Sequence, residues 1–160
     1  MSRSFILFST ARPLELVDAL SPSFDGDVEV REEDGHYNIR ALWKDGAFLI
    51  SHTEEAKDET YAIGLEDYQD SLLYLEESEN ERFQKMEIRL YHCQIQCEIE
   101  PVNRFFLSID DYALMIDFPI LITDTELKPM LEADIGLDWY RWHQTRLSDP
   151  AVKAKYYSDP

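Results

Sequence analysis

The chain has little of what usually marks a metal site or an active site. It contains two cysteines, Cys93 and Cys97, and five glycines, none of which forms the glycine-rich loop that binds phosphate. On a strand the two cysteines would lie roughly 13 Å apart, too far for a disulfide or a shared zinc ion. The four histidines are widely separated, and there is no G-x-S-x-G sequence. We therefore expect no metal, no cofactor and no enzymatic activity.

Long hydrophobic runs are also missing. The longest run, from Tyr112 to Ile122, is interrupted by Asp117 and Pro119, so no segment approaches the ~20 apolar residues of a membrane span. Two cysteines without a disulfide pattern favour a reducing compartment. The sequence therefore predicts a cytoplasmic protein that does not bind membranes.

Positive charge is scarce. Fifteen Lys and Arg residues face 33 Asp and Glu residues, which gives a net charge of −18 and a pI of about 4.4. Direct binding to nucleic acid is unexpected, because it would need a basic surface. The apolar content of 44% is too high for a disordered acidic chain. We expect one domain over residues 1–147, followed by a weakly ordered tail at residues 148–160.

Alternating apolar residues predict an α+β fold with a largely antiparallel sheet. A meander is expected near residues 27–52, with turns at Asp34-Gly35 and Asp45-Gly46. Further strands are expected at residues 5–8 and 91–99, and the segment from Arg104 to Phe118 fits either strands or a helix. Three to four packed helices complete the expectation: one after Pro13, one from Leu65, one behind the capping box Thr123-x-x-Glu126, and one over 139–147.

Negative charge is concentrated in residues 54–81, where eleven acids and one lysine leave −10 of the total. An exposed loop at residues 54–60 is expected to lead into a helix with an apolar stripe, and this helix continues through Glu81. The stripe consists of Leu65, Tyr68, Leu72 and Leu75. The candidate partner-binding residues lie opposite or beside it: Glu66, Asp67, Asp70, Tyr74 and Glu77.

This group of predicted partner-binding residues has two interpretations. It fits a helix that is merely solvated on one side. It also fits a docking surface for a basic partner, in which the carboxylates steer the encounter and Tyr74 supplies an anchor.

A second candidate surface lies near the C-terminus, in Trp139-Tyr140-Arg141-Trp142-His143. Most of these aromatic side chains are expected to pack in the core. An exposed part, formed by Trp139, Trp142 and Arg146, would make a secondary binding surface or the rim of a small-ligand pocket.

The leading hypothesis is an acidic protein that neutralises or regulates a basic protein partner. Bacterial immunity proteins and antitoxins, which block the active site of a cationic toxin such as a nuclease, have this physical profile. One alternative is a DNA mimic or phage-type inhibitor of a DNA-binding enzyme. Another is a small-ligand domain or enzyme with a pocket near Trp139 and Trp142. The sequence does not indicate an oligomeric state.

Overall fold

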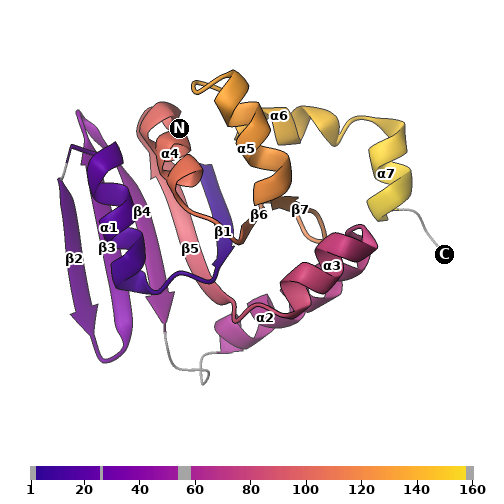
Figure 1. Ribbon diagram of the computed structural model, residues 1–160, viewed down its shortest axis with the longest axis horizontal. Coiled ribbons are helices and arrows are strands. Elements are labelled where there is room, and N and C mark those ends of the chain that lie inside the picture. Colours follow the sequence, from indigo (N-terminus) through magenta and orange to yellow (C-terminus); the bar gives the residue numbers. More distant parts are fainter. Residues whose placement is uncertain (1–2, 26, 54–58, 158–160) are drawn as a thin grey trace.

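The computed structural model describes residues 3–25, 27–53 and 59–157, which form a single α+β domain around a seven-stranded sheet (Figure 1). Every pair of neighbouring strands is antiparallel, in the order β2-β3-β4-β5-β1-β6-β7. The strands are β1 (Arg3–Ser9), β2 (Val28–Glu33), β3 (His36–Trp43), β4 (Gly46–Thr53), β5 (Arg89–Gln96), β6 (Tyr112–Met115) and β7 (Leu121–Thr123). The predicted fold class and antiparallel sheet are confirmed.

The described residues contain seven α-helices and one short 3₁₀ helix, so the expectation of three to four helices is too low. They are α1 (Pro13–Ser23), α2 (Glu59–Ser71), η1 (Leu72–Tyr74), α3 (Glu77–Gln84), α4 (Ile99–Ser108), α5 (Asp124–Ala133), α6 (Trp139–Arg146) and α7 (Pro150–Tyr157). The segment from Arg104 to Phe118, which fitted two structures, contains the end of helix α4 followed by strand β6. The weak order expected for the tail stays a prediction, although residues 150–157 form α7.

The meander predicted near residues 27–52 is confirmed as β2, β3 and β4. Asp34 and Gly35 both have positive φ (51° and 82°), as a two-residue hairpin turn requires. The second turn lies one residue earlier than expected, because Lys44 has the positive φ (50°). Gly46 serves close packing instead: a Cβ atom there would lie 2.1 Å from the carbonyl oxygen of Gln96.

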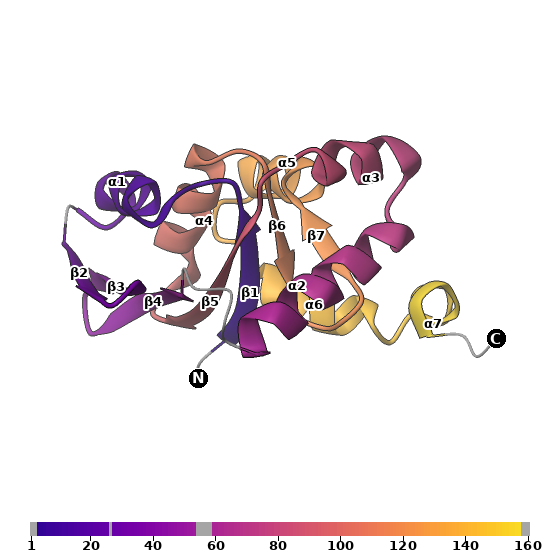
Figure 2. The same cartoon turned by 90° about the horizontal axis from the view of Figure 1, so that it is seen from below.

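One face of the sheet carries the main core. Helices α1, α4 and α5 lie over this face (Figure 2), and Trp139 at the start of α6 is packed into the same cluster. Phe5 is central, with ring centroids 5.1 Å from Trp139 and 6.0 Å from Phe106. The Trp139 indole N–H donates to Asn103 Oδ1 at 2.9 Å, which satisfies the one polar atom of the buried ring.

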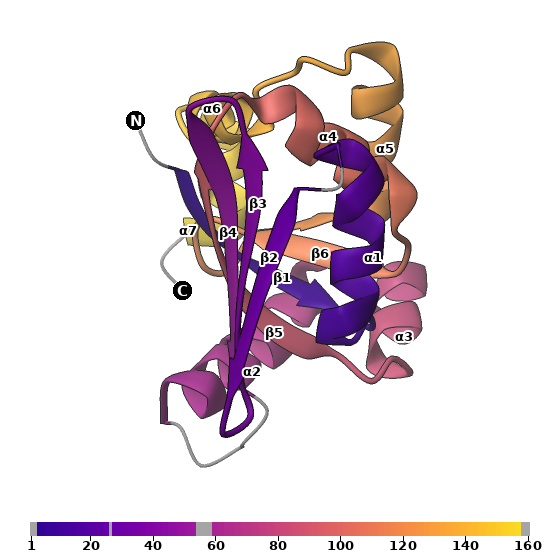
Figure 3. The ribbon, with the colours of Figure 1, turned by 90° about the vertical axis from the view of Figure 1, so that its left-hand side faces the viewer.

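The other face is covered only in part. Helices α2, η1 and α3 pack on β1, β5, β6 and β7 through a smaller apolar cluster. Its buried members are Phe8, Tyr68, Leu72, Phe83, Leu90, Ala113, Met115 and Leu121. On this side no described helix lies over the β2–β4 meander (Figure 3). No helix in the described part of the chain combines the length and apolarity needed to cross a membrane.

Candidate functional site

The first of the predicted partner-binding residues lie on the outer side of α2. Glu66 and Asp70 are exposed one turn apart, whereas Tyr68 and Leu72 are buried on the opposite side. The predicted stripe is thus confirmed as the side that faces the sheet. Residues 54–58, most of the loop expected at 54–60, lie outside the described residues.

The predicted single helix through Glu81 is wrong, because the chain leaves α2 at Ser71 and starts α3 at Glu77. The Ser71 hydroxyl donates to the carbonyl oxygen of Asp67 at 2.6 Å. The side-chain amide of Asn80, on α3, donates to the carbonyl oxygen of Leu72 at 2.7 Å and holds the bend. Glu77 therefore belongs to a second helix, next to the face that carries Glu66 and Asp70.

Apolar side chains stand exposed among these carboxylates. Leu73 has 76% of its surface exposed and Ile63 has 57%. Tyr74 is partly exposed, and its ring lies 5.4 Å from the ring of Tyr156 on α7. Sequence reasoning missed Ile63 and Leu73, although the doublet Leu72-Leu73 contained a signal: two adjacent helical residues cannot both face the sheet.

Most acids of this region have no internal partner. From Glu66 to Glu81 the sequence has seven carboxylates and no Lys or Arg. Five of them are exposed and make no ion pair or side-chain hydrogen bond with another described residue: Glu66, Asp70, Glu76, Glu77 and Glu81. We call these five residues, with Ile63, Leu73 and Tyr74, the acidic face.

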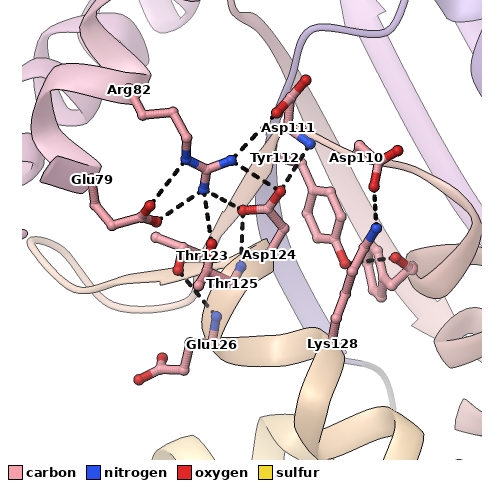
Figure 4. Close-up of polar contacts among 11 residues, drawn as sticks. Glu79, Arg82, Asp110, Asp111, Tyr112, Thr123, Asp124, Thr125, Glu126 and Lys128 are labelled. Carbon is pink, nitrogen blue, oxygen red and sulfur yellow. Dashed lines mark hydrogen bonds and ion pairs between the residues drawn. The ribbon is translucent and has the colours of Figure 1, made fainter.

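Arg82 is the cation of α3, and its charge is balanced by carboxylates within the protein (Figure 4). Its guanidinium binds Asp124 Oδ1 at 2.5 Å, Glu79 at 2.9 Å and Asp111 at 3.3 Å. These contacts tie α3 to the start of α5 and to the turn before β6. They attach α3 to the rest of the domain, and because Arg82 is paired with these carboxylates it does not compensate the acidic face.

The Arg82 contacts also determine the charge state of Asp124. Burial alone would raise the pKa of Asp124, but the hydrogen bond and charge of Arg82, with the backbone N–H groups of Asp111 and Thr125, lower it below its usual range. The hydrogen bond to Asp124 likewise raises the pKa of Arg82 above its usual range. The pair is therefore fully ionised at neutral pH.

The second candidate surface is largely internal. Trp139 has no exposed surface, so it belongs to the core and is not part of a binding surface. Arg146 lies over the Trp142 ring at 4.4 Å and donates from Nε to Nδ1 of the buried His143 at 3.2 Å. Burial, and then the charge of Arg146, lower the pKa of His143, whose Nε2 lies 3.1 Å from Asp117.

Thiol and metal chemistry find little support among the described residues. Burial raises the pKa of the Cys93 thiol well above its usual range, and burial followed by the charge of Glu98 raises that of Cys97 to about 11. Neither thiol is a thiolate at neutral pH. The described part of the chain contains no group of three or more His, Cys, Asp or Glu side chains placed to hold a metal ion.

Asp67 lies apart from the other predicted residues. It is half-buried and lines a hollow of about 1140 Å³ on the partly covered face of the sheet, beside α2. Of the five predicted partner-binding residues, Glu66, Asp70, Tyr74 and Glu77 are thus exposed, and Asp67 borders the hollow.

Comparisons with known proteins identify no relative: no family model, no curated protein and no solved structure matches this chain. The functional argument therefore depends on the physical properties of the surface.

Proposed function

We propose that this protein binds a basic protein partner through the acidic face and thereby neutralises or regulates it. The single observation that carries the proposal is the exposure of Leu73 and Ile63 within a group of unpaired carboxylates. A single exposed apolar side chain, such as Leu14 on α1, is ordinary, whereas two large aliphatic side chains among five unpaired carboxylates make a mixed surface suited to binding.

The two kinds of side chain have complementary roles in association. Carboxylates without internal partners create a negative potential that raises the rate of encounter with a cationic surface. Apolar side chains ringed by polar groups supply the desolvated centre from which most binding energy comes. The ion pair of Arg82 with Asp124 ties α3 to α5, and such a preorganised surface would lose less entropy on binding.

The class that these properties fit best is the immunity protein or antitoxin that blocks a cationic, nuclease-type toxin. A nuclease cleft must be positive to hold phosphate groups, so an acidic surface is the natural counterpart of such a cleft. This protein would act by occupying the cleft and would need no catalytic group of its own.

A comparative capture experiment tests the proposal. The intact protein and a variant with Asp70→Lys and Leu73→Asp are immobilised and exposed to extract of the source cells. The matched control carries Asp18→Lys and Leu14→Asp on α1, where both residues are also exposed and spaced at one helical turn. We expect a basic protein to bind the intact protein and the control, to be lost with the variant, and to elute at about 0.5 M salt.

Two outcomes contradict the proposal. Equal capture by the variant and the intact protein would show that the acidic face is not the contact surface. Capture of a DNA-binding enzyme that is not a nuclease-type toxin would instead favour the DNA-mimic alternative, whereas displacement by duplex DNA alone is expected for both.

A further inference from the structure

The face of the sheet that α2, η1 and α3 cover in part carries a cross-strand row of six residues, which runs from the open β2–β4 end to Met115 in the buried cluster. The strand registers place Arg31, Asn38, Ser51, His92, Ile6 and Met115 side by side, from β2 through β3, β4, β5 and β1 to β6. All six line the hollow of about 1140 Å³. With neighbouring strands about 4.8 Å apart, five spacings make the row about 24 Å long.

The polar half of this row has no internal hydrogen-bond partners. With other described residues, the side chains of Arg31, Asn38, Ser51, His92 and Gln94 make no hydrogen bond or ion pair, and they are wholly or partly open to water. Within the described part of the chain, Arg40 pairs with Glu29 alone, at 3.5 Å, with both side chains more than half exposed. Such a pair contributes little in water and is easily exchanged for another carboxylate.

The chemistry changes steadily along the hollow. The end at β2 and β3 carries the two guanidinium groups of Arg31 and Arg40. The middle carries hydroxyl, imidazole and amide groups. The end at β1 and β6 is mainly apolar, with Ile6, Met115 and the exposed Phe118, although Ser4 of β1 and Asp67 of α2 also line the hollow.

We propose that this hollow binds an extended peptide segment of about seven residues, with an acidic side chain at the end near Arg31 and Arg40 and a large apolar side chain near Ile6 and Phe118. At about 3.4 Å per residue, seven residues span the length of the row. Asn, Gln and Ser both donate and accept hydrogen bonds, so the middle of the hollow can pair with the N–H and C=O groups of a peptide backbone.

Other occupants fit less well. The hollow is larger than the roughly 300–1000 Å³ of most small-molecule pockets. A fatty acid could place its carboxylate at Arg31, but its chain would then cover Asn38, Ser51 and His92 and leave these polar groups without water or partners. A peptide satisfies both halves of the hollow.

The peptide site does not depend on the acidic face. The two arginines lie on β2 and β3, three and two strand spacings from β5, where α2 makes contact. Arg31 is thus about 14 Å from that edge, beyond the Debye length of about 8 Å at physiological salt. The acidic end of a peptide would therefore meet the arginines, and Asp67 is the one described α2 carboxylate that lines the hollow.

Selection from a phage-displayed library of random heptapeptides on the intact protein tests this inference. We expect enriched sequences to carry Asp or Glu at one end and Phe, Leu or Trp at the other. Selection on an Arg31→Glu variant should lose the acidic preference and keep the apolar one. The absence of such a pattern, its persistence with Arg31→Glu, or binding of oleate without peptide enrichment would overturn the proposal.

Fluorescence anisotropy with one selected, labelled peptide then measures how much single residues contribute to peptide affinity. Arg31→Glu should weaken binding by about tenfold or more and Phe118→Ala by several fold. Arg104→Glu, an exposed reversal on the helix-covered side, should leave affinity within about twofold. The variant with Asp70→Lys and Leu73→Asp should bind the peptide normally, so failure of the proposed function would not remove this site. An equal loss of peptide affinity in Arg31→Glu and Arg104→Glu would contradict the peptide site. The thermal unfolding temperature of each variant, compared with that of the intact protein, separates a loss of binding from a loss of folding.

Discussion

On the face of the sheet that α1, α4 and α5 cover, the side chains of β1, β4 and β5 are apolar and buried, whereas the same strands present Ser4, Ser51 and Gln94 to the other side. The first set is dictated by the need to exclude water. The second set is not, because nothing described covers it at the β2–β4 end. The difference teaches that stability accounts for the residues that helices cover on both faces, Phe8 and Leu90 included, whereas it does not dictate the polar residues at the open β2–β4 end.

The largest expected change in the free energy of unfolding distinguishes the two faces of the sheet. Phe48→Ala should lower the free energy of unfolding by about 3–5 kcal/mol, because a fully buried ring that contacts Phe5 and Phe24 leaves a cavity. Gln94→Ala, on the neighbouring strand and the opposite face, should change it by less than about 0.5 kcal/mol. Denaturant unfolding of both variants measures the contrast, and similar losses would mean that the uncovered face is structural.

The next effect concerns the cluster that holds the acidic face in place. Arg82→Met should cost about 2–3 kcal/mol, somewhat less than a fully buried pair, because Asp124 is left nearly buried without its cation while Arg82 is itself partly exposed. A double variant with Asp124→Asn should lose much less than the two single changes together.

The stability lost in Arg82→Met depends on pH with a definite sign. Arg82 lowers the pKa of Asp124 in the folded state, so the stabilisation is complete above about pH 4, the unfolded value, and disappears as the pH falls through the lowered folded pKa. In Arg82→Met burial raises the pKa of Asp124, so the difference in unfolding free energy between the intact protein and this variant should start to shrink as the pH falls through that raised pKa, and continue to shrink through the lowered pKa of the intact protein. A difference that stays constant down to about pH 2 would contradict this account.

The smallest effect lies on the acidic face itself. Glu66 and Asp70 are like charges one helical turn apart, so Glu66→Lys should stabilise the protein by a few tenths of a kcal/mol, and Glu66→Gln by about half as much. The midpoint of urea unfolding measures both. A destabilised Glu66→Lys variant would show that Glu66 has a structural partner.

The sequence predicted local structure better than surfaces. Alternation and the Asp34-Gly35 turn were sufficient for the β2–β4 meander, and the Thr123 cap of α5 is where its spacing placed it. The strand expected at residues 91–99 ends at Gln96, because α4 starts at Ile99 with Pro101 in its first turn, where a missing N–H costs nothing. Each of these outcomes depends on a few neighbouring residues.

The candidate sites depend on pairing between distant segments, which periodicity cannot supply. Arg31 and His92 are 61 positions apart and share one row only because β2, β3, β4 and β5 pair in a particular register. The break between α2 and α3 was hidden for a similar reason, since Asn80 stabilises it from the following helix. The acidic residues could be read from the sequence, and the doublet Leu72-Leu73 indicated that one of the two is exposed, but the exposure of Ile63 could not be predicted.

The salt dependence of partner affinity tests the central claim most directly. For the captured partner, the logarithm of Kd should rise steeply with the logarithm of salt concentration for the intact protein. With Glu66→Lys and Asp70→Lys together the slope should fall markedly, while the control with Asp18→Lys keeps it. A slope that is the same in all three proteins would contradict the assignment of the acidic face as the binding surface.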